Sequence, residues 1–301
     1  MPAIGVDLGG TKLAIGIVDE TGRILKKHLE PTNPEEGSKA ILRRIVKGMK
    51  EIWQGDIKGI GIGCPGTVDA PRGEVIFAPN LGWRKVLVGP VIEQEFNLPV
   101  VVDNDANAAA FGELKVGGGQ GCQHMIYLTV STGIGAGIII DGRIYRGFTF
   151  RAGEVGHMVL EANGPLCSCG NRGCLEAFAS GTSIARRARE ALDKGLPSLM
   201  KGEVDSRVVA TAARQGDFVA EEILAWAFRY LSMGIGNLLN VFDPELIIIG
   251  GGLSAMGDEL LGPVREGVIQ YAWLREKAKE RVVLSKLGRD IGLIGAASLV
   301  L

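Results

Sequence analysis

The sequence predicts an α/β protein with two domains built on one plan. Apolar runs of strand length alternate with helical stretches along almost the whole chain. A pattern of strand, tight turn and strand occurs twice, 122 residues apart, with Ala14 aligned on Ala136 and Asp19 aligned on Asp141. This period is too long for a solenoid, and 301 residues are enough for two hydrophobic cores. The repeat therefore indicates two related domains.

The first copy of the pattern predicts a three-stranded antiparallel meander, with strands at Ala3–Leu8, Leu13–Val18 and Arg23–Leu29. Gly-Gly-Thr-Lys at 9–12 joins the first two strands without a following helix, which excludes a P-loop and a dinucleotide fingerprint. The second copy predicts strands at Met125–Ser131, Ile134–Ile140 and Arg143–Tyr145. The two turns are either ordinary tight hairpins or clusters of backbone N–H donors for a polyphosphate.

The remaining periodicity predicts helices and further strands in alternation. Helices are expected at Glu35–Trp53, Val86–Phe96, Ala106–Gly117, Ser183–Asp193, Ser206–Gln215, Phe218–Phe242, Met256–Tyr271 and Ile291–Leu301. Strands are expected at Lys58–Gly63, Pro99–Val102, Leu246–Ile249 and Arg281–Ser285. The last helix is expected to pack back on the first domain. Cys64 continues an apolar strand and is expected in the core.

Two positions at strand ends are candidate ligand sites. Asp105 follows a predicted strand and opens a helix, so it is either the helix N-cap or a polar group at the strand end where α/β sheets bind ligands. The glycines at 250–252 lie between a strand and a helix. Such a triplet allows close backbone approach to a flat or anionic ligand.

The stretch from Ala152 to Ala179 predicts a structural zinc site. Its candidate ligands, in the spacing H-x9-C-x-C-x4-C, are His157, Cys167, Cys169 and Cys174. Three thiolates and one imidazole complete the tetrahedral shell that zinc prefers and leave no position for a catalytic water. The alternative is a disulfide or unrelated buried thiols. An odd number of cysteines, five in the chain, disfavours it.

Two glutamates flank these ligands. Glu154 precedes His157 by three residues, and Glu176 follows Cys174 by two. A ligating imidazole donates its other N–H to a fixed acceptor. A loop stiffened by metal that carries two acceptors and one donor suits recognition of a polyhydroxylated molecule. The alternative is that both glutamates are solvated surface residues.

Composition and charge exclude several classes of function. Hydrophobic residues make up 46% and charged residues 22%, as in a soluble globular protein. The net charge of -1 shows no basic excess, so nucleic acid is not an expected partner. Apolar runs are too short to span a bilayer, so no membrane partner is expected. The N-terminal residues lack a signal sequence, which favours a cytoplasmic location.

With these residues in view, the chain resembles the ROK family (repressors, open reading frames and sugar kinases), most closely its bacterial-type glucokinases. The motifs that carry the resemblance are DLGGTK (7–12), CPGTVD (64–69), PNLGW (79–83), DNDANAAAFGE (103–113), STGIGAG (131–137), GEVGH (153–157), CSCGNRGCLE (167–176) and IIIGGG (247–252). One departure is Ser131-Thr132-Gly133, where the family often has Gly-Thr-Gly. This departure affects only the expected geometry of that loop.

The resemblance implies an actin-like, hexokinase-like (ribonuclease H-like) two-domain ATPase fold. A small N-terminal domain would comprise residues 1–116 and 290–301, and a larger C-terminal domain residues 117–289 with the zinc loop at 153–176. The implied activity is ATP-dependent phosphorylation of the 6-hydroxyl of a hexose, most closely glucose, with Mg²⁺ and a structural Zn²⁺. The family also implies a homodimer or homotetramer.

The resemblance also implies roles for individual residues. Asp105 would be the general base that takes the proton of the sugar hydroxyl. The implied sugar-binding set is Gly66, Asn80, Asn104, Asp105, Glu154, His157 and Glu176. The implied phosphate loops contain Gly9, Gly10, Thr11, Lys12, Thr132 and Gly133, and the implied adenosine loop contains Gly250, Gly251 and Gly252. Asp7 would lie near the Mg²⁺ ion.

Three other functions are weighed against this one. Sibling kinases of the family act on fructose, mannose, N-acetylglucosamine or N-acetylmannosamine, and the sequence does not display the pocket that would accept an acetyl group. Sugar-responsive repressors of the family carry a helix-turn-helix domain ahead of the DxGGT motif, whereas Asp7 is here near the first residue. A zinc-knuckle nucleic-acid binder is disfavoured by the neutral charge.

Overall fold

The protein, described here by a computed structural model of all 301 residues, divides into two compact units. The first unit comprises Met1–Tyr127, Gly137–Ala152 and Lys286–Leu301, and the second comprises Leu128–Ala136 and Gly153–Ser285. Each unit contains strands of a mixed five-stranded sheet. None of the helices has both the length and the apolar character that crossing a membrane requires.

The sheet of the first unit has the order β3-β2-β1-β4-β8, with β3 at Ile24–Pro31, β2 at Lys12–Val18, β1 at Ala3–Leu8, β4 at Ile60–Cys64 and β8 at Val100–Asn104. The first three strands pair antiparallel, which confirms the predicted meander. β1, β4 and β8 pair parallel. The carboxyl ends of these three strands therefore meet at one edge of the sheet, where α/β sheets bind ligands.

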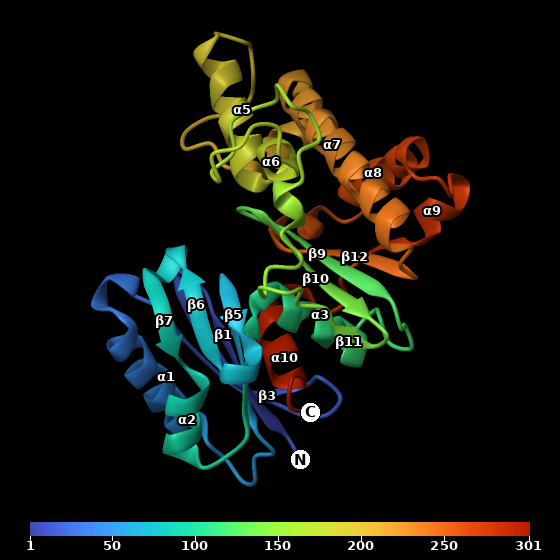
Figure 1. The fold of residues 1–301 in the computed structure, drawn as a ribbon. Coiled ribbons are helices and arrows are strands. Elements are labelled where there is room, and N and C mark those ends of the chain that lie inside the picture. Colours follow the sequence, from blue (N-terminus) through green and yellow to red (C-terminus); the bar gives the residue numbers. More distant parts are fainter. The chain divides into compact units, whose positions relative to one another are not determined.

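Helices cover both faces of this sheet. α1 (Ser38–Ile52) and α2 (Gly89–Phe96) lie on one side, where Ile4, Val6 and Leu8 of β1 share a buried core with residues of both helices (Figure 1). α10 (Ile291–Ser298) packs on the other side against β1, β4 and α3 (Asp105–Val116), as predicted for the last helix. A Cβ at Gly61 would lie 1.7 Å from the carbonyl oxygen of Ala296. Glycine at this position therefore permits the close approach of α10 to the sheet.

The first unit also contains a small antiparallel sheet that the sequence did not predict. Its order is β5-β6-β7, formed by β5 (Thr67–Asp69), β6 (Glu74–Ala78) and β7 (Trp83–Leu87). Val86 and Leu87 pair with β6, so the helix expected at Val86–Phe96 begins only at Gly89. The prediction was wrong at these residues because their apolar spacing also suits an edge strand. Short 3-10 turns at Ala70–Arg72 and Pro79–Leu81 connect the strands.

The second five-stranded sheet has the order β11-β10-β9-β12-β13. Its strands are β9 (Met125–Val130), β10 (Ile134–Ile140), β11 (Arg143–Ile144), β12 (Leu246–Gly250) and β13 (Val282–Leu284). β12 and β13 pair parallel, and β10 and β11 pair antiparallel. These bounds match the predicted strands to within one or two residues, and the turn predicted between β9 and β10 is present.

The helices of the second unit are α4 (Leu175–Ala179), α5 (Gly181–Asp193), α6 (Ser206–Arg214), α7 (Phe218–Phe242), α8 (Asp258–Tyr271) and α9 (Glu276–Glu280). The long α7 packs against α4, α5, α6 and α8, and it runs beside α8 in Figure 1. Phe178 of α4 stacks on Tyr230 of α7 with ring centroids 3.7 Å apart. α8 begins at Asp258 and not at Met256, because Gly252–Met256 forms a 3-10 helix and Gly257 has a φ of +62°.

Candidate functional site

Asp105 is the first residue of α3, directly after β8. Asn104 is the N-cap of this helix, because its Oδ1 accepts hydrogen bonds from the backbone N–H groups of Ala106 at 2.9 Å and Asn107 at 3.2 Å. The interpretation of Asp105 as the N-cap is therefore wrong. Its side chain is exposed and accepts one hydrogen bond, from Ala106 N–H at 2.8 Å. Since the capping is done by Asn104, most of the acceptor capacity of Asp105 is left for other partners.

The pKa of Asp105 suits a group that accepts a proton near neutral pH. Desolvation by the surrounding protein, followed by the negative charge of Asp7, raises the pKa of Asp105 from 3.8 to about 6. The carboxyl keeps solvent access despite this desolvation, as a group that meets a substrate must. Desolvation also raises the pKa of Asp7, and the nearby charges of Lys12 and Lys27 oppose this rise. Perturbed carboxyl groups at strand ends are frequent at functional sites.

The other candidates of the first unit lie beside these two carboxylates. Gly9 to Lys12 form the turn between β1 and β2, closed by a hydrogen bond from Gly9 N–H to the carbonyl oxygen of Lys12 at 2.9 Å. A Cβ at Gly10 would lie 3.2 Å from the Cβ of Asn80, so this turn and Asn80 are neighbours. Asn104 Nδ2 donates to the carbonyl oxygen of Gly66 at 3.1 Å.

The four predicted metal ligands of the second unit converge. The ligand atoms of His157, Cys167, Cys169 and Cys174 all lie within 4.8 Å of one another. His157 Nδ1 lies 3.6 Å from the Cys167 sulfur, and the sulfurs of Cys169 and Cys174 are 3.7 Å apart. Gly170 and Gly173 have φ of +92° and +72°, which residues with a side chain rarely adopt, so they form the tight turns of the loop. The cluster could hold a metal ion.

The chemistry of these donors fits a cation. Burial, followed by hydrogen bonds to the other two cysteines, raises the pKa of the Cys174 thiol to about 12. A bound cation stabilises thiolates, so metal binding would deprotonate this group at neutral pH. A set of three sulfurs and one imidazole matches the Cys₃His shell of structural zinc sites.

Glu154 and Glu176 lie close to this cluster. Glu154 Oε2 lies 3.9 Å from His157 Nε2, the ring nitrogen that does not face the cysteines. Glu176 accepts a hydrogen bond from the Ser168 hydroxyl at 3.1 Å through Oε1 and one from Ile134 N–H at 2.9 Å through Oε2. The alternative that both glutamates are free surface residues is therefore wrong for Glu176, because its carboxylate joins two segments of the unit.

The turn at Thr132 and Gly133 and the glycine triplet are also neighbours. A Cβ at Gly251 would lie 2.6 Å from the carbonyl oxygen of Val130, and one at Gly252 would lie 3.3 Å from the Ser131 hydroxyl. Gly251 has a φ of +80°, so both its backbone conformation and its close approach to β9 favour glycine. The end of β9 and the start of the 3-10 helix after β12 therefore form one surface.

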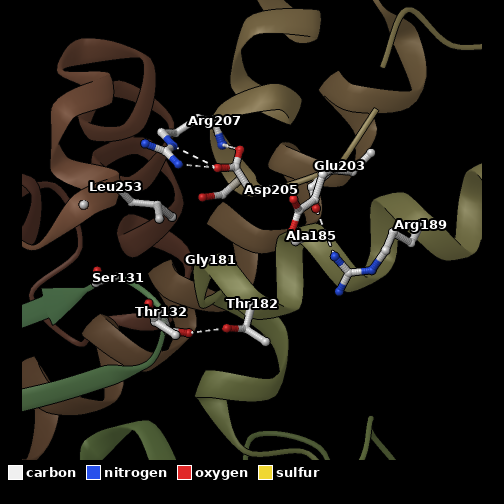
Figure 2. Close-up of a pocket in the computed structure, with 13 residues that line it drawn as sticks. Ser131, Thr132, Gly181, Thr182, Ala185, Arg189, Glu203, Asp205, Arg207 and Leu253 are labelled. Carbon is white, nitrogen blue, oxygen red and sulfur yellow. Dashed lines mark hydrogen bonds and ion pairs between the residues drawn. The ribbon is translucent and has the colours of Figure 1, made fainter. Parts of the chain in front are cut away.

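This surface is one wall of a pocket of about 450 Å³ (Figure 2). Ser131, Thr132 and Gly252 line it. Its other lining residues, for which no function was predicted from the sequence, include Thr182, Ala185, Arg189, Glu203, Asp205, Arg207 and Leu253. Arg207 pairs with Asp205 at 2.7 Å, and Arg189 donates to the carbonyl oxygen of Val204 at 2.9 Å. For the side of the pocket that contains Arg189, Asp205 and Arg207, the sequence showed only that α6 begins there; Asp205 is the N-cap of this helix. The pocket offers charged and hydroxyl groups beside a glycine-rich wall.

Comparison with known proteins gives matches over nearly the whole chain. The model of the ROK family matches residues 3–301. A glucokinase of Thermotoga maritima is 40% identical over 99% of this chain and 96% of its own length. A xylose repressor of Caldicellulosiruptor bescii is 34% identical over 99% of this chain and 77% of its own length.

A solved structure extends these matches to the fold. The crystal structure of a ROK family glucokinase from Streptomyces griseus, in complex with glucose and AMPPNP, superposes with a TM-score of 0.85. The two sequences are 38% identical, and the match covers 99% of each chain. This similarity confirms the predicted actin-like, hexokinase-like α/β fold, and the protein contains the predicted cluster of three cysteines and one histidine.

Proposed function

Because the chain belongs to the ROK family, we propose that it is an ATP-dependent kinase that phosphorylates the 6-hydroxyl of glucose. The observation that carries the proposal is the similarity, over 99% of each chain, to a glucokinase that binds glucose and AMPPNP. Glucokinases of Thermotoga maritima and Streptomyces coelicolor, each 40% identical to this chain, give further support.

In this proposal Asp105 is the general base. Its carboxylate takes the proton of the sugar hydroxyl while the hydroxyl oxygen attacks the γ-phosphorus of ATP. The bond to the β,γ-bridging oxygen breaks, and ADP leaves with both bonding electrons. Phosphoryl transfer depends mainly on positioning and charge neutralisation, so one well-placed base is sufficient. The exposed position and raised pKa of Asp105 support this role.

Polar groups of each unit would bind the sugar hydroxyls. In the first unit these are Gly66, Asn80 and Asn104, of which Asn104 is held by its own hydrogen bond to Gly66. In the second unit they are Glu154, His157 and Glu176, all beside the cysteine cluster. Side chains that are already held by hydrogen bonds or by the metal, such as Asn104 and His157, lose little conformational entropy when the sugar binds.

The glycine-rich turns would bind the nucleotide. Backbone N–H groups of Gly9 to Lys12 and of Thr132 and Gly133 suit phosphate oxygens, since clustered amide donors bind anions. The pocket bordered by Gly252 and Arg189 has room for the nucleoside, with Gly250 and Gly251 permitting close backbone approach. Mg²⁺, held near Asp7, would neutralise charge on the transferred phosphoryl group. The cluster of His157 and three cysteines would hold Zn²⁺ in a structural role.

The experiment that tests this function is a coupled assay of ADP release with Mg-ATP and a panel of hexoses and N-acetylhexosamines. We expect turnover with glucose well above the other sugars, and loss of turnover in Asp105→Asn. Asp56→Asn changes an exposed aspartate of the same unit and serves as the matched control. A highest rate with fructose, mannose or an acetylated sugar would show that this sugar, and not glucose, is the substrate. Absence of sugar-dependent turnover would overturn the kinase proposal.

A second candidate function is sugar-responsive transcriptional regulation. The observation that favours it is the 34% identity to a xylose repressor, of which this chain spans 77%. A gel-shift titration with operator-like DNA at low salt, with and without xylose, tests it. DNA binding that xylose releases, in a protein without kinase turnover, would establish this function instead.

A homodimer or homotetramer is part of the main proposal. Light scattering of the purified protein tests this oligomeric state.

A further inference from the structure

A single short segment of the second unit holds the turn between β9 and β10. Gly181 N–H donates to the carbonyl oxygen of Ser131 at 2.7 Å, and the Thr182 hydroxyl donates to that of Thr132 at 2.8 Å. Glu176 Oε2 accepts from Ile134 N–H at 2.9 Å. Three successive parts of the turn are thus bound by residues that lie within seven positions of one another.

The same segment begins at the cysteine cluster. Cys174 is a candidate metal ligand and the N-cap residue of α4, and Glu176 lies in the first turn of that helix. The other carboxylate oxygen of Glu176 accepts from the hydroxyl of Ser168, which lies between the ligands Cys167 and Cys169. Glu176 is therefore bonded on one side to the metal-binding loop and on the other to the turn.

The turn is fitted closely to this carboxylate. A Cβ at Gly133 would lie 2.5 Å from Glu176 Oε2, so the backbone at 133 packs directly on it. Because Ser131 and Thr132 also line the 450 Å³ pocket, a shift of α4 would move one wall of that pocket. α4 has further anchors: Phe178 stacks on Tyr230 of α7, and Arg186 of α5 donates to the carbonyl oxygen of Ala177 at 3.0 Å.

We propose that the metal cluster controls nucleotide binding, with Glu176 as the positioning residue that fixes the Ser131–Ile134 turn. This inference rests on the proposed function, since it takes the turn and the pocket as the ATP site. It assigns the metal an effect on the nucleotide that is independent of the sugar. Loss of the metal would loosen the loop at Ser168 and the start of α4. The backbone N–H groups of the turn would then be less well ordered for phosphate oxygens.

The first experiment measures nucleotide affinity without sugar. Calorimetric titration with Mg-AMPPNP would compare the metal-loaded protein with protein stripped by a chelator. Coupling between two sites typically changes affinity by about 5–150-fold. We therefore expect removal of the metal to weaken the affinity for Mg-AMPPNP by at least about fivefold. Hydrogen exchange of the Ile134 amide should become faster in the stripped protein, while the Ile248 amide in β12 should keep its protection. Equal affinity and unchanged Ile134 exchange would overturn the proposal.

The second experiment keeps the metal bound and changes Glu176, which connects the metal-binding loop to the turn. Glu176→Ala removes both hydrogen bonds, whereas Glu176→Gln retains a carbonyl acceptor for Ile134 and an amide donor for Ser168. We expect Ala to weaken Mg-AMPPNP binding at least about fivefold and Gln to restore most of the affinity, with metal content measured in each variant. Glu221→Ala, an exposed glutamate of α7, is the matched control. If the stripped protein unfolds, the folded, metal-loaded Glu176 variants still decide the question.

The outcomes separate this inference from the proposed function. Nucleotide binding that is independent of the metal and of Glu176, together with glucose turnover, would overturn the inference and leave the kinase proposal intact. Absence of nucleotide binding by the loaded wild-type protein would overturn both.

Discussion

Asp7 of β1 and Asp105, which follows β8, lie on either side of β4, where Gly63 places no side chain between them. Asp7 pairs in register with Gly63 of β4, and Gly63 pairs with Asp103 of β8, two residues before Asp105. A Cβ at Gly63 would lie 3.6 Å from the Asp105 Cα, an ordinary van der Waals contact, so β4 passes directly beside the start of α3. Both aspartates therefore belong to the carboxyl edge of the sheet. Desolvation raises the pKa of both carboxyl groups, and the negative charge of Asp7 adds to the rise at Asp105.

The raised pKa of Asp105 predicts a pH dependence of catalysis. A general base must be ionised, and the pKa of Asp105 is about 6. We expect kcat/KM for glucose to be nearly constant above pH 7 and to fall by about tenfold per pH unit well below pH 6, since kcat/KM reports the free enzyme. Initial rates from pH 4.5 to 8.5, with return to pH 7.5 to confirm reversibility, measure it. A flat profile in reversibly folded protein would contradict the role of Asp105.

The same shift predicts that Asp105 lowers stability at neutral pH. Its pKa is higher in the folded state than the value of 3.8 expected without the fold, so the folded state favours the protonated form. The stabilising contribution of that proton is complete below about pH 4 and is lost as the pH rises through about 6. Asp105→Asn, which is neutral at every pH, should therefore raise Tm by about 2–4 °C at pH 8. The gain should shrink at pH 4.5.

Thermal unfolding of the wild type, Asp105→Asn and the exposed control Asp56→Asn at both pH values measures this difference. A Tm of Asp105→Asn below that of the wild type at pH 8 would show that the ionised carboxylate is stabilised by the fold.

Regular periodicity made much of the fold predictable from the sequence. β1, β2 and β10 are continuous apolar runs bounded by turn residues, and the 25-residue α7 has helical apolar spacing. The cysteine cluster was predictable because three of its four ligands lie within eight residues, so local turns suffice to bring them together. Long-range packing was not required for either inference.

Other features depend on tertiary structure that periodicity does not encode. β5 has three residues and β7 lies at a sheet edge, so neither repeats its pattern often enough to be distinguished from a helix start. Asn104 and Asp105 are both good capping residues, and only the extended backbone of Asn104, with ψ of 145°, decides between them. Arg189 and Asp205 line one pocket because α5 and α6 pack together, which sequence spacing does not reveal.

The buried carboxylate of Asp103 predicts a large effect of a distant arginine on stability. Asp103 is 1% exposed, and its Oδ2 accepts hydrogen bonds from Arg146 Nε at 2.8 Å and Nη2 at 2.5 Å. Arg146→Ala would leave that oxygen buried without its cationic partner. We expect a loss of roughly 1.5–3 kcal/mol in the free energy of unfolding, as for hydrogen bonds to charged groups. Chemical denaturation measures it.

Arg143→Ala is the control for this change, because Arg143 is an exposed arginine only three residues away. Its substitution should alter stability by no more than about 0.5 kcal/mol. Similar losses for both variants would show that the ion pair with Asp103 contributes little.

Loss of one thiol from the cysteine cluster should affect the sugar as well as the metal. Cys169→Ser replaces a thiolate ligand by a hydroxyl, which binds zinc much more weakly, so we expect the purified variant to lose most of its metal. His157 would then no longer be held by the metal, and its side chain would leave its position 3.9 Å from that of Glu154. The expected result is a KM for glucose raised by about tenfold or more, in line with the effect of disturbing metal-site geometry. Metal analysis and initial-rate kinetics measure both quantities, and Cys122→Ser, a cysteine outside the cluster, is the control. Complete loss of metal with an unchanged KM would separate the cluster from sugar binding, and the proposed sugar-binding role of His157 would then have to be abandoned.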